Sequence, residues 1–212
     1  TPINIDPRSP ALPISNPHHL SSDLARAVGP FYTQGFPEDT KALSRGVLSD
    51  AEYMQQADIV LAERMKLYEH SLSNFDDGLL FFYFASLDLN VHMFYRAIDP
   101  ESPLHAEVDM ASFGDVVADL YGRIDRAIGM AMEHMDGRTV LLALSDHGFA
   151  PFRRSFNLNS WLAAEGYATL GDPYSRDQDM YAAADWSETS AYGLGLNGLY
   201  INLRGREREG IV

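Results

Sequence analysis

The stretch Gly78-Leu79-Leu80-Phe81-Phe82-Tyr83-Phe84-Ala85 decides the fold class of this 212-residue chain. An unbroken apolar run of this length is typical of a strand that is buried on both faces, as in a parallel sheet. The run Thr139-Val140-Leu141-Leu142-Ala143-Leu144 has the same character. We therefore expect two buried strands, at residues 79–85 and 139–144.

The chain between these runs predicts how the strands connect. Residues 107–134 carry apolar side chains every three or four positions, which predicts a long amphipathic helix. A strand, a crossover helix and a second strand form a right-handed parallel unit. The sequence therefore predicts an α/β fold with a mostly parallel sheet flanked by helices. Further elements are expected as helices at 17–27, 37–43, 50–72 and 157–165, a loop at 171–191 and a third strand at 199–203.

Composition narrows the possible functions. Hydrophobic residues make up 46% of the chain, which is enough for a sizeable core. The 16 Lys and Arg against 30 Asp and Glu give a net charge of -14, so no nucleic-acid polymer is expected as a partner. The absence of Cys excludes disulfides and thiolate metal sites. No apolar run is long enough to span a membrane.

Two pairs of residues follow the predicted strands and could bind metal. Asp88 and His92 are four apart, so both would point to one side of a helical turn. Asp146 and His147 are adjacent, just beyond the second strand. Each pair has a simpler reading, as a capping Asp beside a surface His or as an Asp-led turn. However, the carboxyl ends of parallel strands share one edge of a sheet, so we expect the pairs to meet. Carboxylate and imidazole are ligands of divalent metals such as zinc.

The motifs also resemble a known family. Ser145-Asp146-His147-Gly148-Phe149 resembles a metal motif of the alkaline phosphatase superfamily, and residues 84–92 resemble its preceding Asp-x-x-x-His motif. Within that superfamily the chain is most similar to the type I phosphodiesterase / nucleotide pyrophosphatase family. Further resemblance runs through residues 1–8, 31–35 and 195–203, so it covers most of the chain.

The resemblance implies an alkaline-phosphatase-like fold and a two-metal site, with zinc expected and manganese as the alternative. Asp88 and His92 would bind the first ion, and Asp146 and His147 the second. The family also needs an upstream Asp ligand, a Thr or Ser nucleophile and a later His ligand. No such upstream motif is recognisable, and no His follows His147. We therefore expect residues 1–212 to form a partial catalytic domain, inactive alone, whose nucleophile lies outside this chain.

The implied activity is metal-dependent hydrolysis of phosphodiester or pyrophosphate bonds in a small phosphate ester or nucleotide. Two alternatives stay open. One is another reaction of the superfamily, catalysed by a phosphomonoesterase, sulfatase or phosphomutase. The other is a non-catalytic acidic α/β module that binds a partner. Arg153 and Arg154 could contact phosphate or be ordinary surface residues. Members of the family often act outside the cytoplasm, which the resemblance alone suggests here. The sequence does not predict the oligomeric state.

Overall fold

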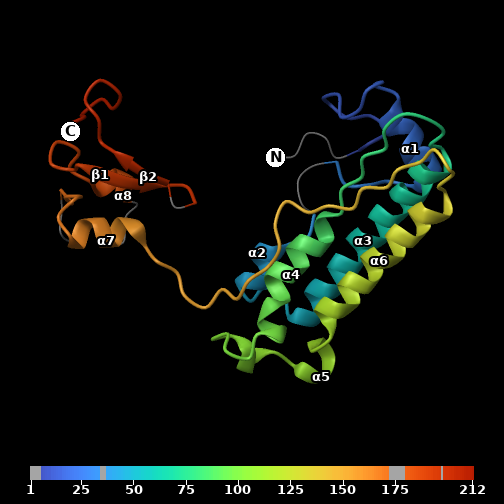
Figure 1. Cartoon of the computed structure of the whole chain (residues 1–212), viewed down its shortest axis with the longest axis horizontal. Coiled ribbons are helices and arrows are strands. Elements are labelled where there is room, and N and C mark those ends of the chain that lie inside the picture. The colour runs from blue at the N-terminus through green and yellow to red at the C-terminus, as the bar shows by residue number, and fades with distance from the viewer. Residues whose placement is uncertain (1–5, 34–36, 172–179, 197) are drawn as a thin grey trace. The chain divides into compact units, whose positions relative to one another are not determined.

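The computed structural model of the chain describes residues 6–33, 37–171, 180–196 and 198–212. Its residues divide into two compact units, Thr1–Arg153 and Arg154–Val212 (Figure 1). Parts of two sequence features lie outside the described residues: the stretches of family resemblance at 1–8, 31–35 and 195–203, and the predicted loop at 171–191.

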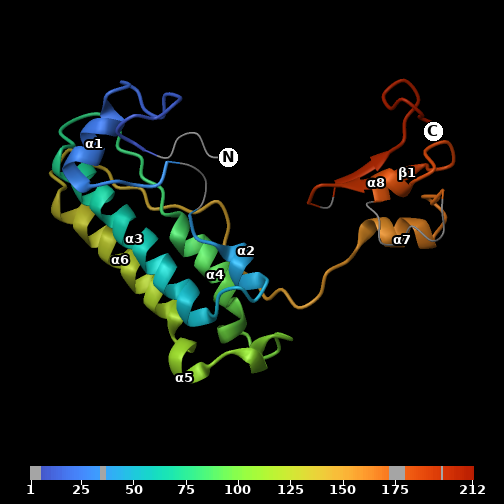
Figure 2. The ribbon, with the colours of Figure 1, turned by 180° about the vertical axis from the view of Figure 1, so that it is seen from behind.

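The first unit is helical. Helices α3, α4 and α6 pack together, and Figure 2 shows the same group from behind. Their shared core contains Tyr53 and Ala57 from α3, Val91 and Phe94 from α4, and Leu120 from α6. The helices of this unit are α1 (Leu20–Val28), α2 (Thr40–Ser44), α3 (Asp50–Ser73), α4 (Ala85–Ile98), η1 (His105–Glu107), α5 (Met110–Phe113) and α6 (Val116–Glu133).

The sequence predicted most of these helices. The long helix expected at 50–72 is confirmed as α3, and Ser49 and Glu52 form the reciprocal hydrogen bonds of a capping box. The helix expected at 107–134 begins later, at Val116. The side chain of Asp109 accepts a hydrogen bond from the Ala111 amide and starts a separate short helix, α5. One apolar pattern is therefore divided into two helices, α5 and α6.

The first predicted strand is extended chain rather than part of a sheet. Gly78 turns the chain with a φ of 97°, in the left-handed region that favours glycine. Leu80, Phe82 and Phe84 then pack against α3 and α6. The alternate side chains face solvent, with Leu79 90% and Phe81 75% exposed. The segment thus has the period-two alternation of a strand, but only one of its faces is covered.

The second predicted strand, 139–144, is also extended and is exposed. Val140, Leu142 and Leu144 are each more than three-quarters exposed. No backbone hydrogen bond pairs 79–84 or 140–144 with another described segment. The expectation of strands buried on both faces in a parallel sheet is therefore not met in this structure. Apolar character makes a segment suitable for a sheet, but a strand also needs a neighbouring strand to pair its backbone groups.

The second unit is small and contains the only sheet among the described residues. Strands β1 (Ala191–Leu194) and β2 (Gly198–Ile201) pair antiparallel, with Ala191 opposite Ile201. The predicted strand at 199–203 is thus confirmed as β2, with an antiparallel partner. Helix α7 (Leu158–Ala164) confirms the helix expected at 157–165, and α8 spans Met180–Ala183. Leu162, Ala168 and Ala191 form the core of this unit.

Candidate metal site

Helix α4 positions the first two candidate ligands. Asp88 lies in its first turn, where a carboxylate interacts favourably with the helix dipole. His92 follows one turn later on the same face, and its Nε2 lies 3.3 Å from Asp88 Oδ1. Both residues are partly or well exposed, whereas the opposite face of α4 is buried. The pair therefore opens away from the core.

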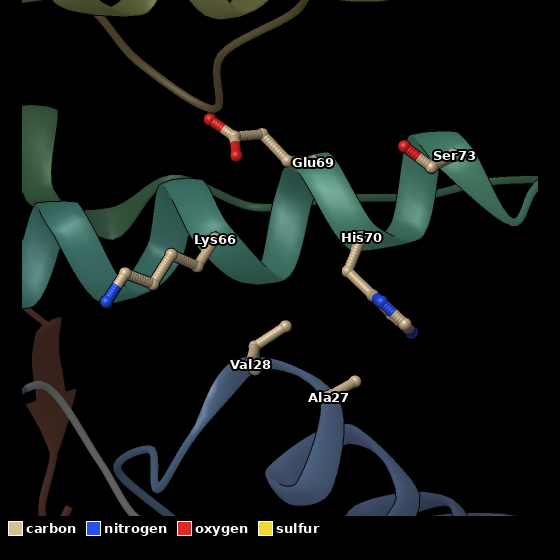
Figure 3. Close-up of a pocket in the computed structure, with 6 residues that line it drawn as sticks. All are labelled: Ala27, Val28, Lys66, Glu69, His70 and Ser73. Atoms are coloured by element: carbon tan, nitrogen blue, oxygen red, sulfur yellow. The ribbon is translucent and has the colours of Figure 1, made fainter.

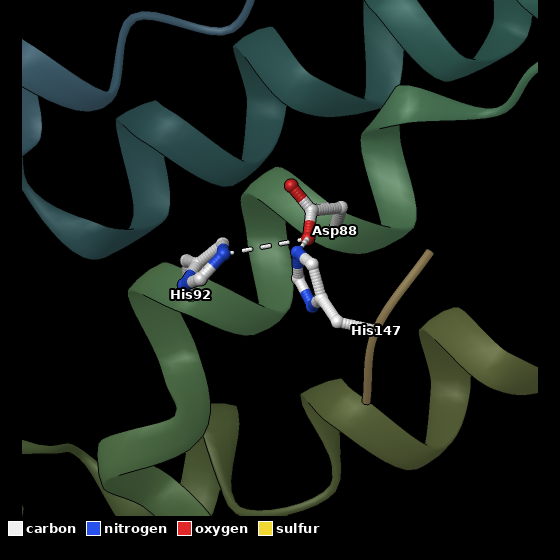
Figure 4. A group of neighbouring side chains, drawn as sticks. All are labelled: Asp88, His92 and His147. Atoms are coloured by element: carbon white, nitrogen blue, oxygen red, sulfur yellow. Dashed lines mark ion pairs between the residues drawn. The ribbon is translucent and has the colours of Figure 1, made fainter. Parts of the chain in front are cut away.

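His147 joins this pair from a distant part of the sequence. Its Nε2 lies 3.5 Å from Asp88 Oδ1. Figure 4 shows both imidazole rings turned toward the same carboxylate oxygen. One ligand atom from each of the three residues lies within 4.8 Å of the others. The structure thus brings together three of the four residues that the sequence singled out.

The Asp88 carboxylate shows whether these residues fit a metal ion. Its Oδ1 is buried and has no hydrogen-bond partner among the described residues. A buried acceptor without a donor is costly, and a cation or a water molecule can supply the partner that such an atom lacks. Ligand atoms about 2.0–2.1 Å from a tetrahedral zinc lie about 3.3 Å apart. The two distances from Asp88 Oδ1 match that spacing, so the donor set and its geometry fit a zinc-like ion.

The tautomer of His147 also suits metal binding. Its Nδ1 lies 3.0 Å from the Gly148 carbonyl oxygen, which can only accept, so Nδ1 carries the proton. The lone pair of Nε2 then faces Asp88. This hydrogen bond, together with the charges of Asp146 and Asp88, raises the pKa of His147 above its ordinary value. The same arrangement orients metal-binding histidines in general.

Asp146 does not join the cluster in this structure. Its side chain is 79% exposed, and its Oδ2 lies 3.8 Å from His147 Nε2. It does lie close enough to Tyr83 to help raise the pKa of that phenol, after the larger effects of burial and Asp88. Asp146 is therefore beside the site, with its carboxylate open to solvent.

Two buried polar contacts hold the first turns of α4 from behind. The Tyr53 hydroxyl donates to Asn90 Oδ1 at 2.7 Å, and the Ser86 hydroxyl donates to Glu38 Oε1 at 2.5 Å. Asn90 and Ser86 are each 1% exposed. These contacts fix the rotation of α4, and thereby the direction in which Asp88 and His92 point.

The sequence did not reveal two further contacts near the site. The ring of Phe149 lies 4.8 Å from that of His92 and 6.1 Å from that of Tyr95, measured between ring centroids. Arg153 pairs with Asp99 and Glu101, so it is not an unpaired phosphate contact in this structure. No local pattern could identify Asp99, because its partner is 54 residues away.

An open pocket between α1 and α3 is a weaker candidate. It is lined by Ala27, Val28, Lys66, Glu69, His70 and Ser73. In Figure 3, Lys66 and His70 extend toward α1, whereas Glu69 points away from it. One imidazole beside an ammonium group is a poor set of metal ligands. The cluster of Asp88, His92 and His147 is therefore the candidate site.

Comparison with known proteins agrees with the motifs. Residues 17–211 match the family model described as type I phosphodiesterase / nucleotide pyrophosphatase. No curated protein and no solved structure matches the chain. The match spans both units and includes the three clustered residues. The chain therefore belongs to the type I phosphodiesterase / nucleotide pyrophosphatase family.

Proposed function

We propose that this chain supplies part of a zinc site for hydrolysis of phosphodiester or pyrophosphate bonds. Family membership indicates a hydrolase of this type, and such enzymes are typically metal-dependent. The observation that carries the proposal is Asp88 Oδ1, which is buried, lacks a hydrogen-bond donor and faces two imidazole nitrogens. A small phosphodiester or nucleotide fits the family as substrate, and no described helix is long and apolar enough to cross a membrane.

The residues of the chain have distinct roles in this proposal. A metal pair would lower the pKa of the attacking group and hold the phosphate oxygens. Asp88 and His92 would hold the first ion, and Asp146 and His147 the second. His147 lies close to Asp88 and could share in either set. Asp146 would have to turn its exposed carboxylate toward His147 to bind with it.

We further propose that residues 1–212 are part of a larger catalytic domain. The extended segments 79–84 and 139–144 expose one apolar face each, as strands of an incomplete parallel sheet would. The other strands, the Thr or Ser nucleophile and the remaining ligands would belong to other parts of the parent protein. The parent would then have the alkaline-phosphatase-like fold, and this chain alone would be inactive.

Zinc titration of the metal-free chain tests the site. Calorimetry should show binding that His147→Ala or Asp88→Asn weakens by at least about tenfold. His134→Ala is the matched control, because His134 caps α6 and contacts only a backbone carbonyl in the described structure. Equal zinc affinity in wild type and His147→Ala, or no zinc binding by the wild type, would contradict the proposal.

Activity of the parent protein tests the reaction. Metal analysis and a panel of phosphodiesters, pyrophosphates, phosphomonoesters and sulfate esters should show preference for the first two. Preference for monoesters, or transfer of phosphate within one substrate with manganese bound, would indicate the other reactions of the superfamily. No turnover, with Asp146→Ala changing no measured property, would indicate a non-catalytic module.

A further inference from the structure

The segment that carries His147 has no secondary structure to hold it. Residues 139–153 belong to no helix or strand, and all except Phe149 are exposed. No backbone hydrogen bond joins 140–153 to another described segment. His147 nevertheless lies against the first turns of α4. Side-chain contacts must therefore set its position.

The strongest of these contacts is an ion pair at the far end of α4. Asp99, which follows the last residue of α4, is only 4% exposed. Arg153 donates to it from two nitrogens, with Nε 2.9 Å from Oδ2 and Nη2 2.8 Å from Oδ1. Its third nitrogen, Nη1, donates to Glu101. A two-point contact between guanidinium and carboxylate fixes orientation as well as distance.

Phe149 makes the middle contact. Its ring lies edge-on to that of His92 and stacked against that of Tyr95. The ring of His147 is also close, 5.7 Å away between centroids. The segment therefore touches α4 near Asp88 through His147, near His92 and Tyr95 through Phe149, and beyond the helix end through Arg153.

The length of the segment 147–153 links the contact of Arg153 to the position of His147. An α-helix rises about 16 Å over the eleven positions from Asp88 to Asp99. The six residues from His147 to Arg153 span at most about 20 Å when fully extended. A segment anchored at Asp99 therefore keeps His147 within reach of Asp88 and raises its effective concentration there, so that the weaker contacts of His147 and Phe149 suffice to hold it. Without that anchor, the packing of Phe149 and the polar contacts of His147 would have to hold the segment on α4.

We propose that the Asp99–Arg153 ion pair is a positioning element that holds His147 against Asp88 and His92. It acts through the segment 147–153 and touches no metal or substrate itself. The consequence for metal binding rests on the proposed function, whereas the consequence for the position of His147 does not. The two can therefore be measured separately.

The first test uses the metal-free chain. Nuclear Overhauser effects between the rings of Phe149 and His92 report whether the segment lies on α4. Arg153→Ala and Asp99→Asn should abolish them, and Arg153→Lys should restore them in part, because Lys offers a single point charge in place of the planar fork. Arg154→Ala is the matched control: the Arg154 side chain, unlike that of Arg153, forms no ion pair among the described residues, so the effects should persist.

The second test uses zinc. Arg153→Ala should weaken zinc binding by about 10- to 100-fold, as loss of a ligand-orienting contact does elsewhere, and Arg154→Ala should leave it unchanged. If Arg153→Ala does not fold with Asp99 buried and unpaired, Asp99→Asn/Arg153→Ala removes that charge and allows the same measurements.

The outcomes separate the two proposals. Ring contacts that persist at wild-type strength in Arg153→Ala, or zinc affinity that stays at the wild-type value in that variant, would overturn the positioning role. Loss of the ring contacts in a chain that binds no zinc even as wild type would support the positioning role and contradict the proposed function.

Discussion

The candidate site depends on the carboxylate of Asp88. In the metal-free chain its Oδ1 has no donor, so removing the negative charge should cost little stability. When zinc is absent, the free energy of unfolding of Asp88→Asn, measured in urea, should therefore lie within about 0.5 kcal/mol of the wild-type value. At a zinc concentration 100 times Kd, the wild type should gain about 2.7 kcal/mol and the variant almost none.

Asp125→Asn is the control for this measurement, because Asp125 lies on the exposed side of α6. Its stabilisation by zinc should equal that of the wild type. The assignment of Asp88 as a ligand would be wrong if zinc stabilised Asp88→Asn as strongly as it stabilises the other two proteins.

Asp99 determines a different property, the response of the chain to acid. The hydrogen bonds from Arg153 hold the pKa of Asp99 below its ordinary value, although burial acts in the opposite direction. A carboxylate with a lower pKa in the folded state adds stability above the unfolded pKa and loses it as pH falls through the folded pKa. The stability contributed by Asp99 is therefore lost below about pH 4.

The difference in urea midpoint between wild type and Asp99→Asn should thus stay constant from neutral pH to about pH 4 and shrink below it. Paired urea titrations at several pH values measure this. Asp76→Asn, at an exposed position in the connection after α3, should show no such convergence with the wild type. The two pH values to compare are about 3 and about 7, which lie on opposite sides of pH 4. If the difference in urea midpoint between wild type and Asp99→Asn is the same at both, the ion pair does not stabilise the chain in the way described.

Local sequence patterns predicted some residues of the site and missed others for a physical reason. Asp88 and His92 share a helix face, and Asp146 and His147 follow an extended run, so both pairs were visible in the sequence. The structure gathers three of these residues and leaves Asp146 in solvent. The ion pair of Asp99 has no local pattern, because its partner Arg153 is 54 residues away in the sequence.

At the scale of elements, the contact between α3 and α4 determines the direction in which the Asp88 and His92 side chains point from α4. The Tyr53 hydroxyl is buried, which raises its pKa, and it donates to Asn90 Oδ1. Tyr53→Phe would leave that acceptor buried and unpaired. We expect the free energy of unfolding to fall by about 1–3 kcal/mol. We also expect weaker zinc binding, because α4 then rotates more freely.

Tyr121→Phe is the matched control, since the ring of Tyr121 is half exposed on α6. It should leave both the free energy of unfolding and the zinc affinity unchanged. Equal stability of Tyr53→Phe and Tyr121→Phe in urea titrations would show that the buried hydrogen bond does not hold α4.

Elements differ in how much of their structure local sequence contains. The capping box at Ser49 and Glu52 uses neighbours within one turn, so α3 was predictable to within a residue at each end. Strand pairing is a contact between distant segments. The apolar run at 79–85 therefore predicted an extended segment correctly but could not reveal whether partner strands were present. The same limit explains why β1, the partner of β2, was not predicted.

At the scale of the whole molecule, the candidate site and the apolar surfaces belong to the same unit. Asp88, His92 and His147 all lie within Thr1–Arg153. The extended segments 79–84 and 139–144 lead directly toward these residues in the sequence. In the described structure the candidate ligands thus follow extended segments that, at 79–84 and 140–144, form no backbone hydrogen bond to another described segment.

The exposed apolar side chains predict how the chain behaves in solution. Leu79, Phe81, Val140, Leu142 and Leu144 are all at least three-quarters exposed. Large apolar side chains that are exposed at alternate positions of a segment bind hydrophobic dyes and promote association. We therefore expect the chain to bind such a dye while folded and to sediment as larger species when concentrated. The double substitution Leu142→Thr/Leu144→Thr should reduce both effects and change the free energy of unfolding by no more than about 0.5 kcal/mol.

The same substitution at a buried leucine should instead lower the stability of the chain. Leu120 is 2% exposed in the core of α3, α4 and α6, so Leu120→Thr should lower the free energy of unfolding by about 2 kcal/mol or more and increase dye binding. Dye fluorescence, sedimentation and urea unfolding compare the two variants directly. If Leu142→Thr/Leu144→Thr destabilised the chain as much as Leu120→Thr does, the segment 139–144 would be buried in solution. The proposal that this segment is a strand whose neighbouring strands belong to other parts of the parent protein would then be wrong.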